Sequence, residues 1–413
     1  GRGGIKAVVL NTGQNLLDRK QFELDFPAIN QVVYLNSAGQ GPKPRDTIEK
    51  VAEYYKKTLL MGACVRPLLE EISIEVEKTR LKAANFFGAD VKEIAFIRCV
   101  AEGVNTLLDG LELQTGDEIV TSYEENPAVL IPLHTFAAEK GLLIKKILCP
   151  NDKNKIIENL ERAITERTRL VIVSHVSHTR GLKMPVKEMA DVCHSRKIWL
   201  ALDGAQAAGQ VSVKMSELGC DCYLAAGYKW LLGLHGTTVA VMRRPLLESM
   251  KIRYNGVGSQ SKFDFCTDEI RWKEDASRIE YGSRQWPLYI GLGESLNYLK
   301  KIGINNIEEH VKELRKQLKQ DMRDLGFVCE SPEEDQLSSG IVTFSKNGVD
   351  VERLTRWLFD NRRILVQYRN FASYAECPKG LRISLAFFTS KEELGQLKGG
   401  IADFLREGDT KIG

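Results

Sequence analysis

Lys229 is the residue of this sequence whose surroundings most favour covalent chemistry. It lies between two aromatic side chains in residues 226–230, after the apolar run 223–225 and before Gly233 and Gly236. Because such surroundings solvate an ammonium group poorly, they favour the neutral amine, which can attack a carbonyl carbon and form a Schiff base. The alternative is an ordinary lysine whose amine reaches water.

A carboxylate, Asp203, ends the apolar run of residues 198–203 that precedes this stretch. Such a run is typical of a strand buried on both faces of a parallel sheet. Since ligands in open α/β sheets bind beyond the carboxyl ends of the strands, we expect Asp203 and Lys229 to face one crevice. Pyridoxal phosphate uses both groups, a lysine for its aldehyde and a carboxylate for its pyridinium nitrogen. The pair therefore predicts a pyridoxal-phosphate site.

The motif Asp203-Gly-Ala-Gln206, followed by Gly227-Tyr228-Lys229, resembles the class V aminotransferase group of fold-type I pyridoxal-phosphate enzymes. This group includes cysteine desulfurases, selenocysteine lyases, cystine C–S lyases, isopenicillin N epimerases and, more distantly, kynureninases. The resemblance implies an α/β fold, with a mostly parallel sheet in a large domain and a smaller α+β domain at the carboxyl end. It also implies a homodimer with shared active sites, in which Gln206 and Tyr228 contact the cofactor.

A second cofactor contact is expected where the strand pattern of residues 93–98 gives way to a helix. The free N–H groups and the dipole at a helix amino terminus bind anions. In the family this turn holds the cofactor phosphate and usually carries a hydroxyl, but the matching residues here are Val100 and Ala101, so contact would come from the backbone. Ser283 matches a hydroxyl that reaches the neighbouring subunit's phosphate site.

Two further positions depart from the family pattern. Asn126 stands where relatives have a histidine that stacks on the pyridine ring, and an amide does not titrate near neutrality. Tyr123 is a candidate replacement for the lost acid/base group, although a half-buried structural tyrosine is the simpler interpretation. His178 takes the place of an asparagine near the ring hydroxyl. Arg180 either binds an acidic substrate group or is solvated.

The substrate pocket is assigned through the same resemblance. Arg382 matches an arginine that takes the substrate α-carboxylate, a task suited to the planar guanidinium fork. Asn36 lies in a segment that lines the substrate pocket in relatives. We predict an amino-terminal arm at 1–45, a large domain at 46–290 and a small domain at 291–413. The irregular stretch 250–275 is interpreted as a functional loop over the site.

Composition limits the remaining possibilities. The 413 residues carry a formal charge of +3, which gives no reason to expect nucleic acid or membrane partners. No apolar run is long enough to span a bilayer. The nine cysteines are scattered and odd in number, which favours free thiols in a reducing, cytoplasmic compartment. No cysteine or histidine spacing indicates a metal site.

Several reactions remain open to such a site once the Cα proton has been removed. The carbanion can be reprotonated at the cofactor, which gives transamination, or on the opposite face of Cα, which gives epimerisation. It can also expel a β-substituent. A desulfurase uses a loop cysteine about fifteen residues before the carboxylate arginine, where this chain has Val366, Gln367 and Tyr368; Cys377 lies too close to Arg382. We therefore expect a β-eliminating C–S lyase acting on a small sulfur-containing amino acid. An isopenicillin N epimerase-like epimerase or an aminotransferase is the alternative, and a cofactor-free binding scaffold is a third hypothesis.

Overall fold

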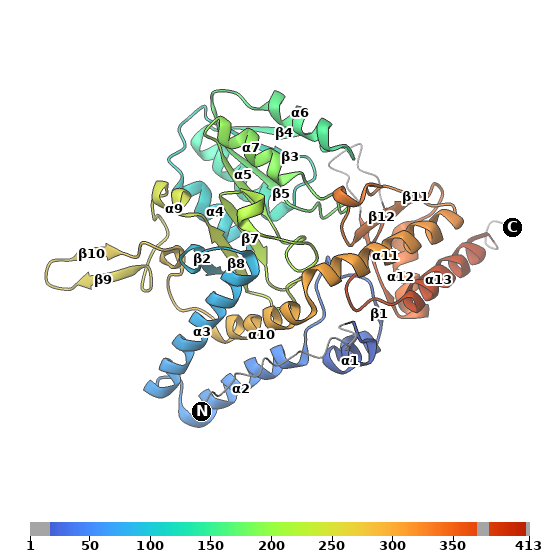
Figure 1. Cartoon of the computed structure of the whole chain (residues 1–413), viewed down its shortest axis with the longest axis horizontal. Helices are drawn as coiled ribbons and strands as arrows, with labels where there is room; N and C mark the ends of the chain where they lie inside the picture. The colour runs from blue at the N-terminus through green and yellow to red at the C-terminus, as the bar shows by residue number, and fades with distance from the viewer. Residues whose placement is uncertain (1–16, 370–379, 410–413) are drawn as a thin grey trace, which may run out of the picture.

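A seven-stranded sheet forms the centre of the computed structural model, which describes residues 17–369 and 380–409 (Figure 1). Its strand order is β2-β8-β7-β6-β5-β3-β4, and only β8 runs against its neighbours. The strands are β2 (Ile94–Ile97), β3 (Glu118–Ser122), β4 (Leu143–Ile147), β5 (Thr168–Ser174), β6 (Trp199–Asp203), β7 (Cys222–Ala226) and β8 (Thr238–Met242). The predicted α/β fold with a mostly parallel sheet is confirmed.

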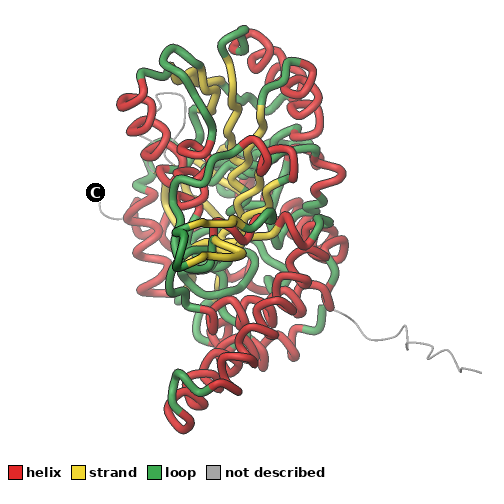
Figure 2. Tube along the Cα trace, turned by 90° about the vertical axis from the view of Figure 1, so that its left-hand side faces the viewer, coloured by secondary structure: helices red, strands yellow, loops and turns green. Residues whose placement is uncertain are grey.

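Each face of this sheet packs on its own core, which explains why the strands read as continuous apolar runs. Along β5, Leu170 and Ile172 enter one core while Val171 and Val173 enter the other, as the alternation of side chains in a strand requires. One core contains side chains of α4 (Val100–Gly110), α5 (Pro127–Lys140) and α9 (Arg244–Ser249). The other contains side chains of α3 (Arg66–Phe87), α6 (Lys153–Ala163), α7 (Val186–Ser195) and α10 (Trp286–Ile302). Figure 2 shows strands in the interior with helices on both sides.

A smaller antiparallel sheet lies at the carboxyl-terminal end of the molecule, with the order β11-β12-β15-β14. Its strands are β11 (Val328–Cys329), β12 (Ile341–Ser345), β14 (Gln367–Arg369) and β15 (Gly380–Ser384). The helices α11 (Ile304–Asp324), α12 (Val351–Arg362) and α13 (Lys391–Asp409) accompany it. The remaining elements are α1 (Arg19–Asp25), α2 (Arg45–Met61), α8 (Met215–Leu218), β1 (Val33–Tyr34), β9 (Gln260–Asp264), β10 (Glu269–Trp272), β13 (Ile364–Leu365), η1 (Pro27–Asn30), η2 (Val91–Glu93), η3 (Ala276–Ile279) and η4 (Asp335–Leu337).

The amino-terminal segment joins this smaller unit. β1 pairs in parallel with β13, and Asn36 bridges to Ser384 at the end of β15. Residues 364–369 form two short strands with different partners, because β13 pairs with β1 and β14 pairs with β15. Helix α10 spans position 290 and packs on α2 and α3. The domain boundaries at 45 and 290 stay a prediction.

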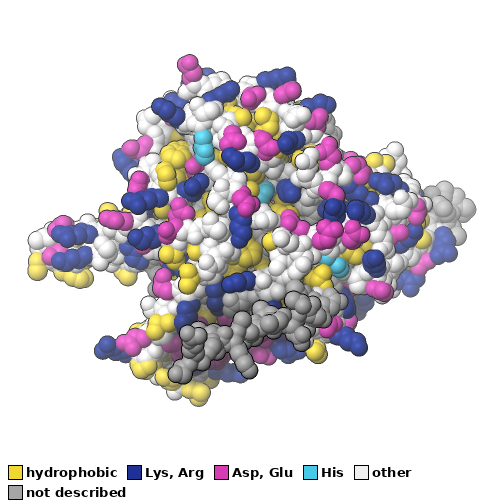
Figure 3. Space-filling view, in the orientation of Figure 1, with side chains coloured by type: hydrophobic (Ala, Val, Ile, Leu, Met, Phe, Trp, Pro, Cys, Tyr) yellow, Lys and Arg dark blue, Asp and Glu magenta, His cyan; other side chains and the backbone are white. Residues whose placement is uncertain are grey.

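Two arms project from the body, one formed by α2 and α3 and the other by the β9–β10 hairpin (Figure 1). The hairpin occupies the stretch expected to be an irregular loop over the site, and it extends away from the main sheet, so that expectation is wrong for this part of the chain. Leu59 and Leu60 on α2 and Phe265 in the hairpin turn are more than 80% exposed. Figure 3 shows apolar side chains along both arms. Exposed apolar ends are typical of interaction surfaces, and the homodimer stays a prediction.

No helix in the described part of the chain is both long and apolar enough to cross a bilayer.

Candidate active site

Asp203 and Lys229 lie at the same edge of the large sheet. Asp203 ends β6, and Lys229 follows the end of β7, the parallel neighbour of β6. Both side chains are buried. Burial lowers the pKa of Lys229 to about 8, and the charge of Asp203 opposes this shift. The structure thus brings together a readily deprotonated amine and a carboxylate, as the sequence indicated.

The backbone of Lys229 is held by the turn of residues 39–44. A Cβ atom on Gly41 would lie 2.2 Å from the Lys229 carbonyl oxygen, so only glycine permits this approach. The Gly41 N–H and the Lys43 Nζ donate hydrogen bonds to the Tyr228 carbonyl oxygen, at 3.2 and 2.6 Å. Burial lowers the pKa of Lys43 to about 8. The turn therefore fixes the position from which the Lys229 side chain begins.

Arg382 lies on β15 of the small sheet and is fully buried. Its guanidinium donates to the His178 carbonyl oxygen at 2.9 Å and to Asn36 Oδ1 at 3.2 Å, while its Nε has no hydrogen-bond partner within 17–369 and 380–409. Burial and the nearby charge of Arg369 hold the pKa of Arg382 well below its ordinary value. A guanidinium in such surroundings is stabilised by an incoming carboxylate.

His178 lies in the loop that follows β5 and is buried. Burial lowers its pKa to about 3, and the charges of Arg369, Arg382 and Lys229 act in the same direction. The imidazole is therefore neutral near pH 7, so it can pack or accept a hydrogen bond but does not supply a proton. The loop after β5 and the small sheet thus meet around Lys229.

Hydrogen bonds join this loop directly to the small sheet. Thr343 Oγ1 on β12 donates to the Thr179 carbonyl oxygen at 2.6 Å, and the Lys183 N–H donates to the carbonyl oxygen of Leu337 in η4, just before β12, at 2.8 Å. A Cβ atom on Gly181 would lie 2.1 Å from the Ile341 carbonyl oxygen. We call this contact between residues 177–183 and the small sheet the seam.

The amino terminus of α4 lies beyond the carboxyl end of β2, the edge strand of the large sheet. Val100 and Ala101 form its first turn, and no side chain caps it, although Cys99 occupies the N-cap position. Glu102 accepts hydrogen bonds from the Arg98 backbone and side chain, which offset its charge. The N–H groups of this turn have the chemistry expected of a phosphate cradle.

Comparison with known proteins identifies the family of this chain. A sequence profile described as Aminotransferase class-V matches residues 33–397. A cysteine desulfurase of Escherichia coli (strain K12 / DH10B) is 27% identical over 393 residues, which cover 91% of this chain and 96% of the relative. The chain belongs to the aminotransferase class-V family.

Solved structures show the same fold. The apo structure of a cysteine desulfurase from Thermococcus onnurineus NA1 superposes with a TM-score of 0.86 at 24% identity, covering 94% of this chain and 98% of that one. The complex of the cystine C–S lyase C-DES with its reaction product cysteine persulfide gives a TM-score of 0.85 at 24% identity, with coverages of 92% and 99%. The class-V chain is thus a pyridoxal-phosphate-dependent enzyme with a fold-type I architecture.

The residues present in the class-V chain fit this cofactor. Lys229 would supply an amine for the aldehyde, and the buried carboxylate of Asp203 would face the ring nitrogen. Burial raises the pKa of Asp203, whereas Lys229 and the Ala205 N–H, 2.8 Å from Oδ1, act against this rise. The uncapped turn of α4 supplies N–H donors for a phosphate.

Other predicted cofactor residues have protein partners of their own. The Gln206 amide donates to the Ala38 carbonyl oxygen at 3.0 Å and accepts from Trp230 Nε1 at 2.9 Å. Gln206 therefore connects Trp230, which follows Lys229 in the chain, to the amino-terminal segment at Ala38. Tyr228 stacks on His235, with 4.2 Å between the ring centroids. Their contact with the cofactor stays a prediction.

Asn126 caps α5, because its Oδ1 accepts from the Ala128 N–H at 2.9 Å. Ser283 is exposed, and its role in a neighbouring subunit stays a prediction. Tyr123 is 44% exposed, and its ring faces Lys146 at 5.9 Å. This position toward the edge strand β4 does not support acid/base work by Tyr123.

The structure corrects the interpretation of Arg180 and adds residues that the sequence did not reveal. Arg180 is paired with the buried Glu124, so it is neither solvated nor directed to a substrate. Glu125 is also buried, and it accepts from Ser122 Oγ at 2.7 Å and Ser174 Oγ at 2.6 Å. Burial raises the pKa of Glu125 to about 7 against these hydrogen bonds, and the charge of Asp203 adds to the rise.

Arg369 is the other addition, because it lies beside Arg382 at the end of β14. Its neighbour in the sheet register is Gly380, two residues before Arg382. The sequence signal that could have revealed this pair is the presence of an arginine in each of two segments that form neighbouring strands. Cys377 lies outside the described residues.

Proposed function

We propose that this enzyme cleaves the C–S bond of a small sulfur-containing amino acid by β-elimination. The observation that carries the proposal is the position of the buried Lys229 amine, whose pKa of about 8 makes it a usable base near Asp203 and two guanidinium groups. Similarity to cysteine desulfurases, and in fold to a cystine C–S lyase, supports a sulfur-containing substrate.

Arg382 and Arg369 would receive the substrate carboxylate. Neither guanidinium has an ion-pair partner among residues 17–369 and 380–409, and burial lowers the pKa of each. A planar guanidinium donates two parallel hydrogen bonds to a carboxylate, which fixes orientation as well as charge. Asn36 beside Arg382 limits the rotation of that fork. These residues would hold the amino acid with its Cα toward Lys229.

Lys229 would act as the general base that removes the Cα proton. Pyridoxal phosphate, held by Lys229 and Asp203, would supply the electron sink that stabilises negative charge at Cα. The Cα–H bond breaks and its proton moves to Lys229 Nζ. The Cβ–S bond then breaks, its electron pair leaves on sulfur, and a Cα=Cβ double bond forms. Water converts the released product to pyruvate and ammonia.

Two neighbours would favour this course. Asp203, as a buried anion, would hold the proton of the ring nitrogen at the edge of the sheet. His178 remains neutral near pH 7 because its pKa is about 3, so it does not reprotonate Cα on another face. A two-base epimerase would need a second acid, and a neutral His178 does not favour that role.

The decisive experiment incubates the holoenzyme with cystine or an S-substituted cysteine without any 2-oxo acid. We expect pyruvate, ammonia and a thiol or persulfide in equal amounts. Cys377→Ser should keep this activity, as should the matched control Cys266→Ser on the exposed hairpin, because direct departure of sulfur needs no thiolate nucleophile.

Other products would identify other reactions. Alanine formed together with sulfane sulfur, and lost in Cys377→Ser, would identify a desulfurase. Solvent deuterium entering Cα with inversion, and without pyruvate, would identify an epimerase. Accumulation of pyridoxamine phosphate with an amino donor would identify an aminotransferase. Each of these results would replace the lyase proposal.

A further inference from the structure

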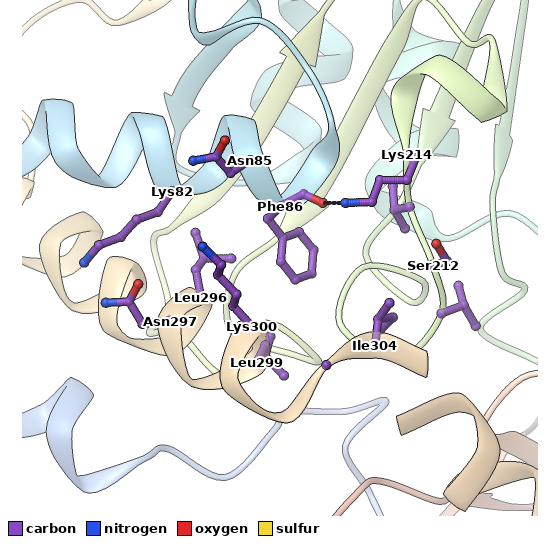
Figure 4. A pocket seen from close by; sticks show the side chains of 13 residues that line it. Lys82, Asn85, Phe86, Ser212, Lys214, Leu296, Asn297, Leu299, Lys300 and Ile304 are labelled. Atoms are coloured by element: carbon purple, nitrogen blue, oxygen red, sulfur yellow. Dashed lines mark hydrogen bonds between the residues drawn. The ribbon is translucent and has the colours of Figure 1, made fainter. Parts of the chain in front are cut away.

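A cavity of about 240 Å³ lies away from Lys229, between the end of α3, the segment that precedes α8, and the α10–α11 junction (Figure 4). Its apolar walls are Phe86, Leu296, Leu299 and Ile304. Leu296 and Leu299 are buried, whereas Phe86 and Ile304 are half-buried. Figure 4 shows the Phe86 ring in the middle of the cavity, above α10. An apolar interior with an open side is typical of a small-molecule site.

Three lysines from three elements line the same cavity, namely Lys82, Lys214 and Lys300. Lys82 forms an ion pair with Glu294 at 3.0 Å. Lys214 donates to the Phe86 carbonyl oxygen at 3.3 Å, and Lys300 has no hydrogen-bond or ion-pair partner in the described ranges. Within the described part of the chain, two of the three positive charges therefore have no carboxylate beside them. An anion that enters the cavity would relieve their mutual repulsion.

We propose that this cavity binds a small amphipathic carboxylate, with its anionic head near Lys300 and its apolar body on Phe86. The volume supports this ligand class. A dry apolar cavity of about 150 Å³ is enough for benzene, so about 240 Å³ accommodates a ring with a short carboxylate chain. Asn85, Asn297 and Ser212 add polar groups to the lining that orient the head. The chain's own first sixteen residues contain Arg2 and Lys6 and no acid, so they lack the complementary charge.

The test measures binding of 4-phenylbutyrate to the holoenzyme by isothermal titration calorimetry. We expect saturable binding that weakens as the salt concentration rises, because the charged head is partly screened. The matched variants are Lys300→Glu, which lines the cavity, and Lys301→Glu, which lies beside it on the same helix and does not. Lys300→Glu should weaken binding by about fivefold or more, while Lys301→Glu should change it less than about twofold.

Two further arms distinguish binding in this cavity from purely apolar binding and from binding in the catalytic pocket. 4-Phenylbutanol has the same apolar body without the carboxylate, so it should bind at least about fivefold more weakly. Arg382→Gln should retain binding, since that residue belongs to the catalytic pocket. Absence of saturable binding, equal effects of the two lysine variants, or loss of binding in Arg382→Gln would each overturn the proposal. Thermal unfolding of every variant verifies that the fold is intact.

Discussion

Two buried guanidinium groups in this protein have opposite surroundings. Arg80 on α3 donates to both oxygens of Glu280, at 2.6 and 2.9 Å, and to the Ile94 carbonyl oxygen. Burial alone would lower the pKa of Arg80, but the hydrogen bonds to Glu280 raise it above its ordinary value. Among the residues that the structure describes, Arg382 has a carbonyl and an amide oxygen as partners and no carboxylate. A buried guanidinium that is already paired with a carboxylate indicates a structural role. A buried guanidinium without such a partner indicates a site for the negative charge of a ligand.

Arg382 belongs to the proposed active site around Lys229, and Lys229→Ala is expected to have the largest effect on that site. Turnover should fall by about 10⁴-fold or more, equivalent to more than about 5 kcal/mol of transition-state stabilisation. Stability should be unchanged or higher, because a desolvated amine is removed. Steady-state kinetics, urea unfolding of the apo-protein and borohydride reduction of the bound cofactor provide the measurements. A variant with normal rates and a reducible cofactor would contradict the assignment of Lys229.

Arg80→Gln should produce the largest loss of stability. Removal of one partner leaves Glu280 as a buried charge, which costs about 3–5 kcal/mol. Urea unfolding measures this loss, and kcat and KM of the remaining folded protein should equal those of the wild type. If the variant instead kept its stability and lost substrate affinity, the distinction between Arg80 and Arg382 would fail.

Arg382→Gln should have the reverse phenotype. We expect KM for the amino-acid substrate to rise about 100-fold, or about 2.7 kcal/mol, with little loss of stability, because no carboxylate is left unpaired. Analogues of the amino acid that lack the α-carboxylate should inhibit the variant and the wild type with equal affinity. An unchanged KM would exclude Arg382 from substrate binding.

Glu125→Gln should have the smallest effect, visible as a pH dependence. The pKa of Glu125 is about 7 in the folded protein and about 4.3 in an unfolded chain. The stability linked to its proton is therefore fully present below pH 4 and falls as the pH rises to about 7. Relative to wild type, the apo-variant should gain about 2.5 kcal/mol between pH 5 and pH 8 in urea unfolding. Parallel pH profiles of the two proteins would contradict this.

The sequence was sufficient for the fold and for the groups at the edge of the large sheet. The run of residues 198–203 predicted β6 because period and hydrophobicity determine such strands locally. Asp203 and Lys229 could be paired because parallel neighbouring strands end at one edge. The family resemblance, which the family match confirms, identified Arg382 as the candidate that receives the substrate carboxylate.

The remaining features depend on packing that sequence spacing does not determine. Arg180 and Tyr123 looked similar in sequence, each a polar residue after a strand, yet one pairs with buried Glu124 and the other faces the surface. The β9–β10 hairpin lacks the clear alternation of a half-buried strand, because its side chains are mostly exposed on both faces. Glu125 was missed because its hydroxyl partners come from two different strands.

The seam has a mechanical consequence for access to the site. Arg382 contributes both to the seam, through the His178 carbonyl oxygen, and to the predicted capture of substrate. The Thr343 hydroxyl and the close approach at Gly181 lie along the same line. A hinge that swung the small sheet away from the large one would break these links together and would also dismantle the receptor for the carboxylate. We therefore expect this enzyme to admit substrate without a hinge motion that separates the small sheet from residues 177–183.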